Sequence, residues 1–145
     1  MIPKLRVTAV WICAALLAAT VDVPASAQSV NLQGVWQHAR VNTRGQSYSG
    51  NITIEANGQA SDVTKRPSGG YARQSGYVTV KGSKVEIVFT SVLADPANPA
   101  IYSADHFYCT IQSAQAMSCS NTDIAGSTSN SFAVVRVGPP PPRTN

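Results

Sequence analysis

Histidines and acidic residues, the side chains from which catalytic and metal sites are most often built, are few and scattered in this chain. His38 and His106 are the only histidines, and neither has a second His or a Cys at metal-ligand spacing. The acidic residues beyond the N-terminal segment form no evident catalytic pair. These are Glu55, Asp62, Glu86, Asp95, Asp105 and Asp123. The sequence therefore predicts no metal, no cofactor and no enzymatic activity.

The N-terminal segment resembles a secretory signal peptide. Lys4 and Arg6 precede an uninterrupted stretch of apolar and small residues at 7–21, and a small-x-small site follows at 25–27. A membrane anchor is the alternative, but this stretch is short of the roughly 20 residues that a spanning helix needs. We expect residues 1–27 to be removed and the mature protein to be periplasmic or secreted, without a stable membrane anchor.

Cys109 and Cys119 are the two cysteines that remain after removal of the leader. In an exported domain an even pair indicates one disulfide. A redox-active pair is the alternative, but such cysteines are usually closer together in sequence. We therefore predict a structural disulfide that closes a hairpin.

The net charge and length of the mature chain bear on its binding partners and on its number of domains. Nine Lys and Arg remain against six Asp and Glu, a net charge of +3, and the basic residues are scattered. Nucleic-acid binding needs clustered cations and is not expected. Residues 28–138 suffice for one domain with its own core. We expect a monomer.

The dominant pattern of the mature chain is a two-residue alternation of polar and apolar side chains, which is typical of β-strands. No apolar stripe of helical period occurs. Turn-forming Gly, Asn, Ser and Thr separate the alternating segments. We predict eight strands near 35–41, 49–56, 59–65, 75–81, 84–92, 105–112, 116–122 and 130–138.

The connections between these strands alternate in length. The second, fourth and sixth are tight, as at Asn57-Gly58 and Gly82-Ser83, whereas the others are longer, near 42–48, 66–74, 93–104 and 123–129. In an antiparallel up-and-down arrangement, alternate connections lie at opposite ends. The pattern predicts an all-β, eight-stranded barrel with a closed base and an open mouth. Four prolines begin at Pro139, so residues 139–145 should form a disordered tail.

The first predicted strand begins with Leu32-Gln33-Gly34-Val35-Trp36, an L-x-G-x-W pattern. This pattern resembles the start of the lipocalins and of related avidin-like barrels. The resemblance implies that Trp36 plugs the closed base and that an Arg on the last strand, here Arg136, packs across it. Both residues would then be structural rather than ligand-binding.

His38 and Arg40 share the strand face of Trp36, so alternation places both inside the barrel. A charge there is costly unless it is paired or meets water or a ligand. Two interpretations are open: the mouth is wet at this level, or these residues are polar anchors in a ligand cavity.

The long connections carry residues that suit recognition, because Tyr and Arg combine contact area with hydrogen bonding. The candidate rim residues are Arg44, Arg66, Tyr71, Arg73 and Tyr102. Such a rim would suit an anionic or sugar-like ligand, or a protein. We therefore expect an exported, non-enzymatic binding module for an unidentified small molecule. The alternative is a protein–protein interaction or inhibitor module of the cell envelope with a filled barrel core.

Overall fold

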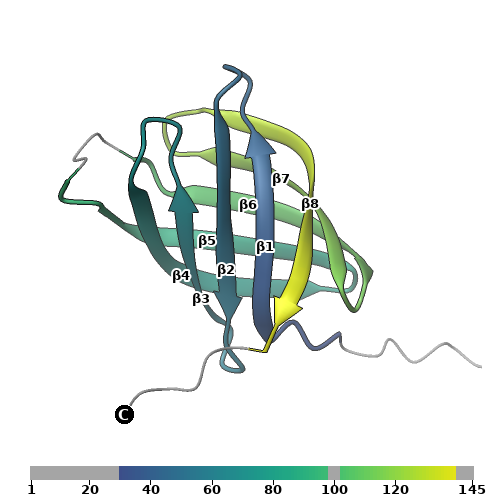
Figure 1. Cartoon of the computed structure of the whole chain (residues 1–145). Helices are drawn as coiled ribbons and strands as arrows, with labels where there is room; N and C mark the ends of the chain where they lie inside the picture. The colour runs from purple at the N-terminus through teal and green to yellow at the C-terminus, as the bar shows by residue number, and fades with distance from the viewer. Residues whose placement is uncertain (1–29, 98–101, 140–145) are drawn as a thin grey trace, which may run out of the picture.

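The chain folds into a closed antiparallel barrel in which each strand pairs with the next and the last pairs with the first (Figure 1). This computed structural model describes residues 30–97 and 102–139, and the leader at 1–27 and residues 140–145 of the predicted tail lie outside them. The strands are β1 (Gly34–Val41), β2 (Ser47–Ile54), β3 (Gln59–Lys65), β4 (Tyr71–Lys81), β5 (Lys84–Ala94), β6 (Asp105–Ser113), β7 (Ala116–Asp123) and β8 (Thr128–Gly138). Across the described ranges, no helix has the length and apolar character needed to span a membrane.

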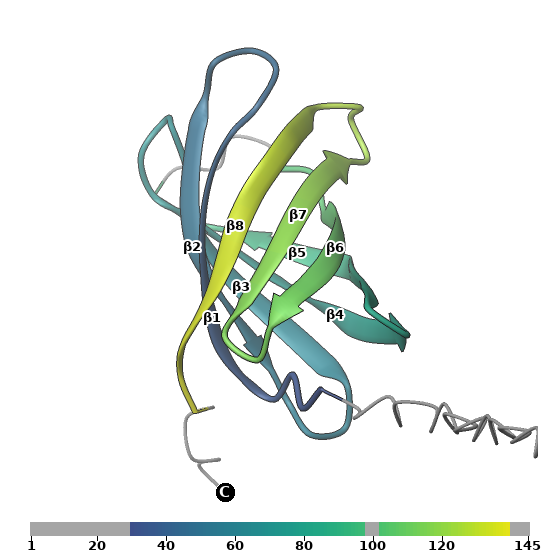
Figure 2. The ribbon, with the colours of Figure 1, turned by 90° about the vertical axis from the view of Figure 1, so that its right-hand side faces the viewer.

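The predicted eight-stranded up-and-down barrel is confirmed, including the separation of its connections between two ends. Figure 2 shows the β1–β2 and β7–β8 connections at the upper end and the β2–β3 and β6–β7 turns at the lower end. Gly58 and Gly82 have positive φ values of 81° and 61°, which these tight turns require. We call the upper end, with its longer connections, the mouth of the barrel, and the lower end its base.

The largest boundary difference is at the start of β4. We predicted a loop over 66–74, but the strand begins at Tyr71, because two successive glycines complete the turn early. Gly69 and Gly70 have φ values of 85° and 70°, and the Gly69 amide donates to the Arg66 carbonyl. Tyr71 and Arg73 therefore belong to a strand and not to a rim loop.

The base of the barrel is filled by apolar side chains. Trp36 and Phe107 are completely buried, and the core cluster continues through Met117 and Phe132. The Trp36 indole donates to the Leu32 carbonyl at 2.8 Å. The Arg136 guanidinium lies 4.7 Å from the centre of the Trp36 ring, the arrangement expected from the resemblance, and cation–π attraction stabilises it.

The predicted disulfide joins Cys109 and Cys119, which are directly paired across β6 and β7. Both cysteines are buried in the core cluster. They face the same side as Phe107 and Met117, as the alternation of the two strands predicts. The bridge therefore fixes the register of this hairpin from inside the barrel.

Candidate functional site

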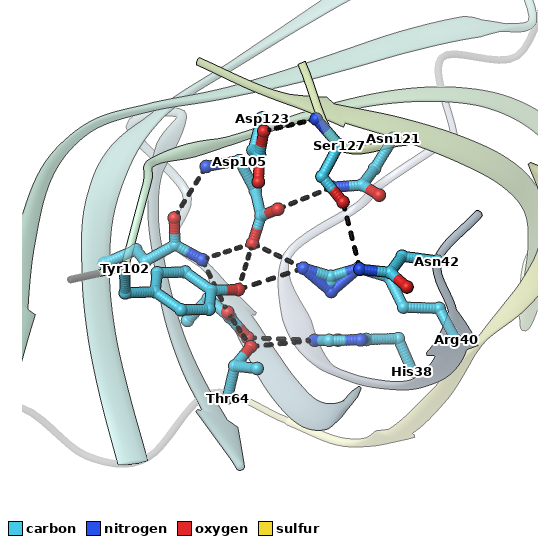
Figure 3. Close-up of polar contacts among 11 residues, drawn as sticks. His38, Arg40, Asn42, Thr64, Tyr102, Asp105, Asn121, Asp123 and Ser127 are labelled. Carbon is cyan, nitrogen blue, oxygen red and sulfur yellow. Dashed lines mark hydrogen bonds and ion pairs between the residues drawn. The ribbon is translucent and has the colours of Figure 1, made fainter. Parts of the chain in front are cut away.

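A layer of buried polar side chains lies inside the barrel between the apolar core and the mouth. It is unusual because such groups need hydrogen-bond partners when they leave water. Figure 3 shows that the side chains come from several strands and point toward one another. The layer is formed by His38, Arg40, Asp62, Thr64, Gln74, Asp105 and Asn121, each no more than 5% exposed.

An ion pair between Arg40 and Asp105 is the centre of this layer. The Arg40 Nη2 lies 2.6 Å from Asp105 Oδ2, and both side chains are 3% exposed. Tyr102 joins the pair, because its hydroxyl donates to the same carboxylate oxygen at 2.5 Å and accepts from Arg40 Nη2 at 3.0 Å. These contacts compensate the cost of burying the Arg40 charge, which the strand alternation had placed inside the barrel.

Amide side chains complete the bonding of the Asp105 carboxylate. Gln74 Nε2 donates to Oδ2 at 2.8 Å, and the Asn121 amide donates to Oδ1. The Gln74 carbonyl in turn accepts the backbone N–H of Asp105 at 2.8 Å. β4, β6 and β7 are thus held around one carboxylate whose position is strongly determined.

A second group of polar residues lies below, sealed from solvent. His38 Nε2 is 3.1 Å from Asp62 Oδ1, the Thr64 hydroxyl donates to Asp62 Oδ2, and Gln74 links Asp62 to Asp105. A Thr, a His and an Asp together resemble a nucleophile with its base and orienting acid. All three are at most 1% exposed, and the Thr64 hydroxyl, 3.5 Å from His38 Nε2, donates to the Asp62 carboxylate.

Two protonation equilibria in the upper group are shifted. Burial alone would lower the pKa of Arg40, but the charge and hydrogen bond of the Asp105 carboxylate, together with the interactions of Tyr102 and Asp62, outweigh burial and raise the pKa overall. Burial raises the pKa of Tyr102 strongly, and the adjacent Asp105 carboxylate raises it further, against the opposing effect of Arg40. Arg40 is therefore a fixed cation and Tyr102 a fixed hydroxyl donor at neutral pH.

A cavity of about 230 Å³ opens above the Arg40–Asp105 pair, and we call it the mouth pocket. Tyr48 and Tyr102 contribute its aromatic surface, with ring centres 6.2 Å apart in an edge-to-face arrangement. The Arg40 guanidinium lies 4.8 Å from the Tyr48 ring centre and 5.2 Å from that of Phe107. The full lining is Arg40, Asn42, Arg44, Gln46, Tyr48, Tyr102, Ser103, Asp105, Asn121, Asp123, Ala125, Ser127 and Ser129.

Two hydrogen-bond donor atoms of Arg40, a residue that lines the mouth pocket, have no hydrogen-bond partner. Arg40 Nε and Nη1 are buried and make no hydrogen bond, although Nη2 makes two. Buried donors without acceptors are costly and uncommon in folded proteins. The rings of Tyr48 and Phe107 lie over this guanidinium, so an oxygen atom from outside the chain would be stabilised at these donors once the Tyr48 ring moves aside.

The structure brings together three of the predicted ligand-binding residues. Arg40, Arg44 and Tyr102 line the mouth pocket. His38 is inside the barrel, as predicted, but lies in the sealed group beneath the pocket.

The other predicted rim residues lie elsewhere. Arg66 is 6% exposed and is not part of the pocket lining. Tyr71 and Arg73 point outward from β4 and line a separate exterior hollow with Leu93 and Asp95. They do not meet the pocket, because the early start of β4 gives them the outward alternation of a strand.

Several important residues escaped the sequence analysis, above all Asp105, Gln74 and Asn121. The signal was present in the strand alternation. Asp105 shares a strand face with Phe107, as His38 and Arg40 share one with Trp36. Extending that alternation to the predicted strands at 59–65, 105–112 and 116–122 would have placed Asp62, Asp105 and Asn121 inside the barrel with His38 and Arg40. Gln74 could not be found in this way, because it fell in the predicted loop at 66–74. In the part of the chain that the structure describes, no group of three or more His, Cys, Asp or Glu could hold a metal ion.

Several solved barrels resemble this one in structure. The redesigned β-barrel mFAP1, solved bound to DFHBI, has a TM-score of 0.55 at 18% identity, over 72% of this chain and 94% of that chain. EF1p2_mFAP2b, also bound to DFHBI, has a TM-score of 0.54 at 16% identity, over 73% and 94%. A de novo designed fluorescence-activating barrel has a TM-score of 0.50 at 12% identity, over 72% and 93%. These similarities support the fold alone.

Comparison of the sequence with protein-family models and with curated proteins gave no match.

Proposed function

We propose that this protein is an exported, non-enzymatic barrel of lipocalin-like architecture that binds a small molecule in the mouth pocket. The observation that carries the proposal is the floor of that pocket, where Arg40 is fixed by Asp105 yet retains two unpaired donors. A rigid floor with unmet hydrogen-bonding capacity is what a preorganised binding site requires.

The packing of the barrel limits where a ligand can enter. The lower interior is occupied by Trp36, Phe107, Met117 and their neighbours, as in other eight-stranded barrels that fill themselves. The ligand would therefore occupy the mouth and not the length of the barrel. The designed barrels of similar fold that were solved with a dye make small-molecule binding a reasonable use of this architecture.

Export is proposed on two supports that are independent of the pocket. Residues 1–27 have the basic start, apolar stretch and small-x-small site of a cleaved leader. The Cys109–Cys119 bridge is of a kind that persists in oxidising compartments.

We propose binding rather than catalysis because of how the pocket's reactive groups are used. Asp105 accepts four side-chain hydrogen bonds and Tyr102 donates to it, so neither is poised to move a proton to or from a ligand. Groups fixed in this way orient a ligand.

Small-molecule binding can be tested by filling the mouth pocket with a large side chain, which removes none of the hydrogen bonds described above. Ala125 lines the pocket, and its neighbour Ile124 is 83% exposed and does not. The wild type, Ala125→Trp and Ile124→Trp would each be incubated with a small-molecule extract of the host and measured by native mass spectrometry. We expect one stoichiometric added mass on the wild type and on Ile124→Trp, and its loss on Ala125→Trp. Equal retention by all three, or no added mass on any, would contradict the proposal.

A protein partner that contacts the mouth loops is the second candidate, favoured by the filled lower core. In that case neither tryptophan variant would lose a small-molecule mass. Crosslinking in the envelope would instead recover a partner from the wild type and lose it in both variants, since both residues lie on the 124–127 connection.

A further inference from the structure

The charges of the mouth pocket balance. Its lining contains two cations, Arg40 and Arg44, and two carboxylates, Asp105 and Asp123. Arg40 and Asp105 already neutralise each other at 2.6 Å. Arg44 is exposed and Asp123 half-buried, and no ion pair joins them, so only their formal charges cancel. At the buried floor, where Asp105 neutralises Arg40, a charged ligand would leave water without an unmatched counter-charge to receive it, and that desolvation is costly.

The geometry of Arg40 also disfavours a carboxylate or phosphate. A guanidinium binds such anions best through two parallel N–H groups on different nitrogen atoms. It has two such pairs, Nε with Nη2 and Nη1 with Nη2, and both include Nη2. Nη2 is already bonded to Asp105 and Tyr102. The remaining donors, on Nε and Nη1, belong to different edges, so each suits a single neutral oxygen.

The rest of the lining offers donors and acceptors at many points. Amide and hydroxyl groups come from both sides of the pocket, and the rings of Tyr48 and Tyr102 can cover the C–H faces of a ring-shaped ligand. Such a wall suits a ligand that carries hydroxyl groups in several directions. The contributing side chains are Gln46, Asn121, Ser127 and Ser129, whereas the amide of Asn42 is fully bonded to Arg44, Gln46 and Ser127.

The size of the pocket sets the scale of the ligand. Drug-sized ligands occupy sites of about 300–1,000 Å³, and a water molecule takes about 30 Å³ of liquid. A cavity of about 230 Å³ therefore accepts one small ring and not a lipid or an oligomer.

We propose that the mouth pocket takes a small, uncharged, hydroxyl-rich molecule of the size of a single sugar ring. This inference rests on the proposed function and adds the ligand class. Oxygen atoms of the ligand accept from Arg40 Nε and Nη1 at the floor. The half-buried Tyr48 ring, which lies over the guanidinium, shifts to admit them.

The test compares ligands that differ in charge and share one ring size. The probes are D-glucose and myo-inositol, both neutral, D-glucuronate, an anion, and D-glucosamine, a cation. Each is titrated into ¹⁵N-labelled protein while the Arg40 Nε–H resonance is followed. We expect the Arg40 resonance to shift with a neutral probe, which binds at least about tenfold more tightly than either charged probe.

A pair of matched variants assigns the effect to the floor. Arg40→Lys keeps the positive charge beside Asp105 and removes the guanidinium donors, whereas Arg73→Lys makes the same change on the outer face. We expect at least about tenfold weaker binding of the neutral probe by Arg40→Lys and no change with Arg73→Lys. Unaltered backbone spectra of both variants would show that they are folded. The shift of the Arg40 resonance in the wild type tests the proposal even if a variant fails to fold.

Two results would overturn the ligand class. Tighter binding of glucuronate at the same resonances would show an anion site, and silence of the pocket resonances with all four probes would exclude sugar-ring ligands. In either case, the native mass spectrometry of Ala125→Trp and Ile124→Trp would still test the proposed function separately, because it does not depend on the class of ligand.

Discussion

Arg40 determines much of the character of the barrel mouth, because it is a buried cation with one acidic partner. Removing one member of such a pair leaves the other charged and poorly compensated in a medium of low polarity. We expect Arg40→Met to lower the free energy of unfolding by about 3–5 kcal/mol, measured by urea denaturation. The double variant Arg40→Met/Asp105→Asn should recover much of this loss. A single variant that costs less than about 1 kcal/mol would show that the pair is not buried as described.

Tyr102 should give the protein a specific sensitivity to alkaline pH. Burial and Asp105 raise its pKa in the folded protein above the value of about 10 for an unfolded chain. Above pH ~10 the unfolded chain loses this proton first, so the free energy of unfolding falls as pH rises, and below that pH the contribution is fully present.

The absorbance of tyrosinate measures this effect directly. In the wild type one of the five tyrosines should ionise in a late step that accompanies unfolding. Tyr102→Phe should abolish that step, and Tyr77→Phe, at a 48% exposed position, should retain it. A late step that survives Tyr102→Phe would show that another tyrosine is responsible.

The sequence placed His38 and Arg40 inside the barrel but did not reveal their partners. Alternation along one strand is local, so the inward face of β1 could be derived from Trp36 alone. The pairing of Arg40 with Asp105 depends on barrel closure, which brings β6 opposite β1 across the interior. Register and tilt decide that contact, and neither is encoded in a single segment.

At the scale of the strands, Gly50 allows β2 to pass closely over the sealed polar group. A Cβ atom at this position would lie 2.5 Å from the Val63 carbonyl oxygen and 2.8 Å from His38 Nε2. We expect Gly50→Ala to cost on the order of 1–3 kcal/mol, because backbone must move to relieve the contact. Gly138→Ala is the control, since a Cβ there meets nothing within 4 Å. Equal thermal midpoints for the two variants would count against this account.

The β6–β7 hairpin should depend on its disulfide. Cys109 and Cys119 close a segment with a sequence separation of 10, for which loop closure in the unfolded chain contributes about 2–3 kcal/mol. Replacing both by Ala should lower the urea midpoint accordingly, and reduction of the wild type should lower it in the same direction. An unchanged midpoint in both experiments would mean that the hairpin is held by its strand pairing alone.

The element boundaries show where local sequence was sufficient. Tight turns at Asn57-Gly58 and Gly82-Ser83 were predicted correctly, because glycine at positive φ specifies them. The start of β4 was not, since Ser68, Gly69 and Gly70 read equally well as part of a long loop. That error assigned Tyr71 and Arg73 to the rim, whereas both lie on the outer wall of the barrel.

For the whole molecule, the barrel was predictable and its interior was not. Polar–apolar alternation and turn residues act locally. They predict the number of strands, their antiparallel order and the difference between the mouth, with its longer connections, and the base, with its tight turns. The division of the interior into an apolar base, a polar layer and a small pocket depends on side chains from several strands meeting in space. The ligand site that we propose is therefore at the mouth, and it is smaller and more polar than an open barrel would offer.

The most direct test of this account is to map where small molecules from the host contact the protein in solution. A host extract would be added to ¹⁵N-labelled wild type, and the amide resonances that shift would be assigned. We expect shifts centred on Tyr48, Tyr102, Asn121 and Ser129 around the mouth pocket. Shifts confined to the outer face of β4 at Tyr71 and Arg73, or none at all, would contradict it.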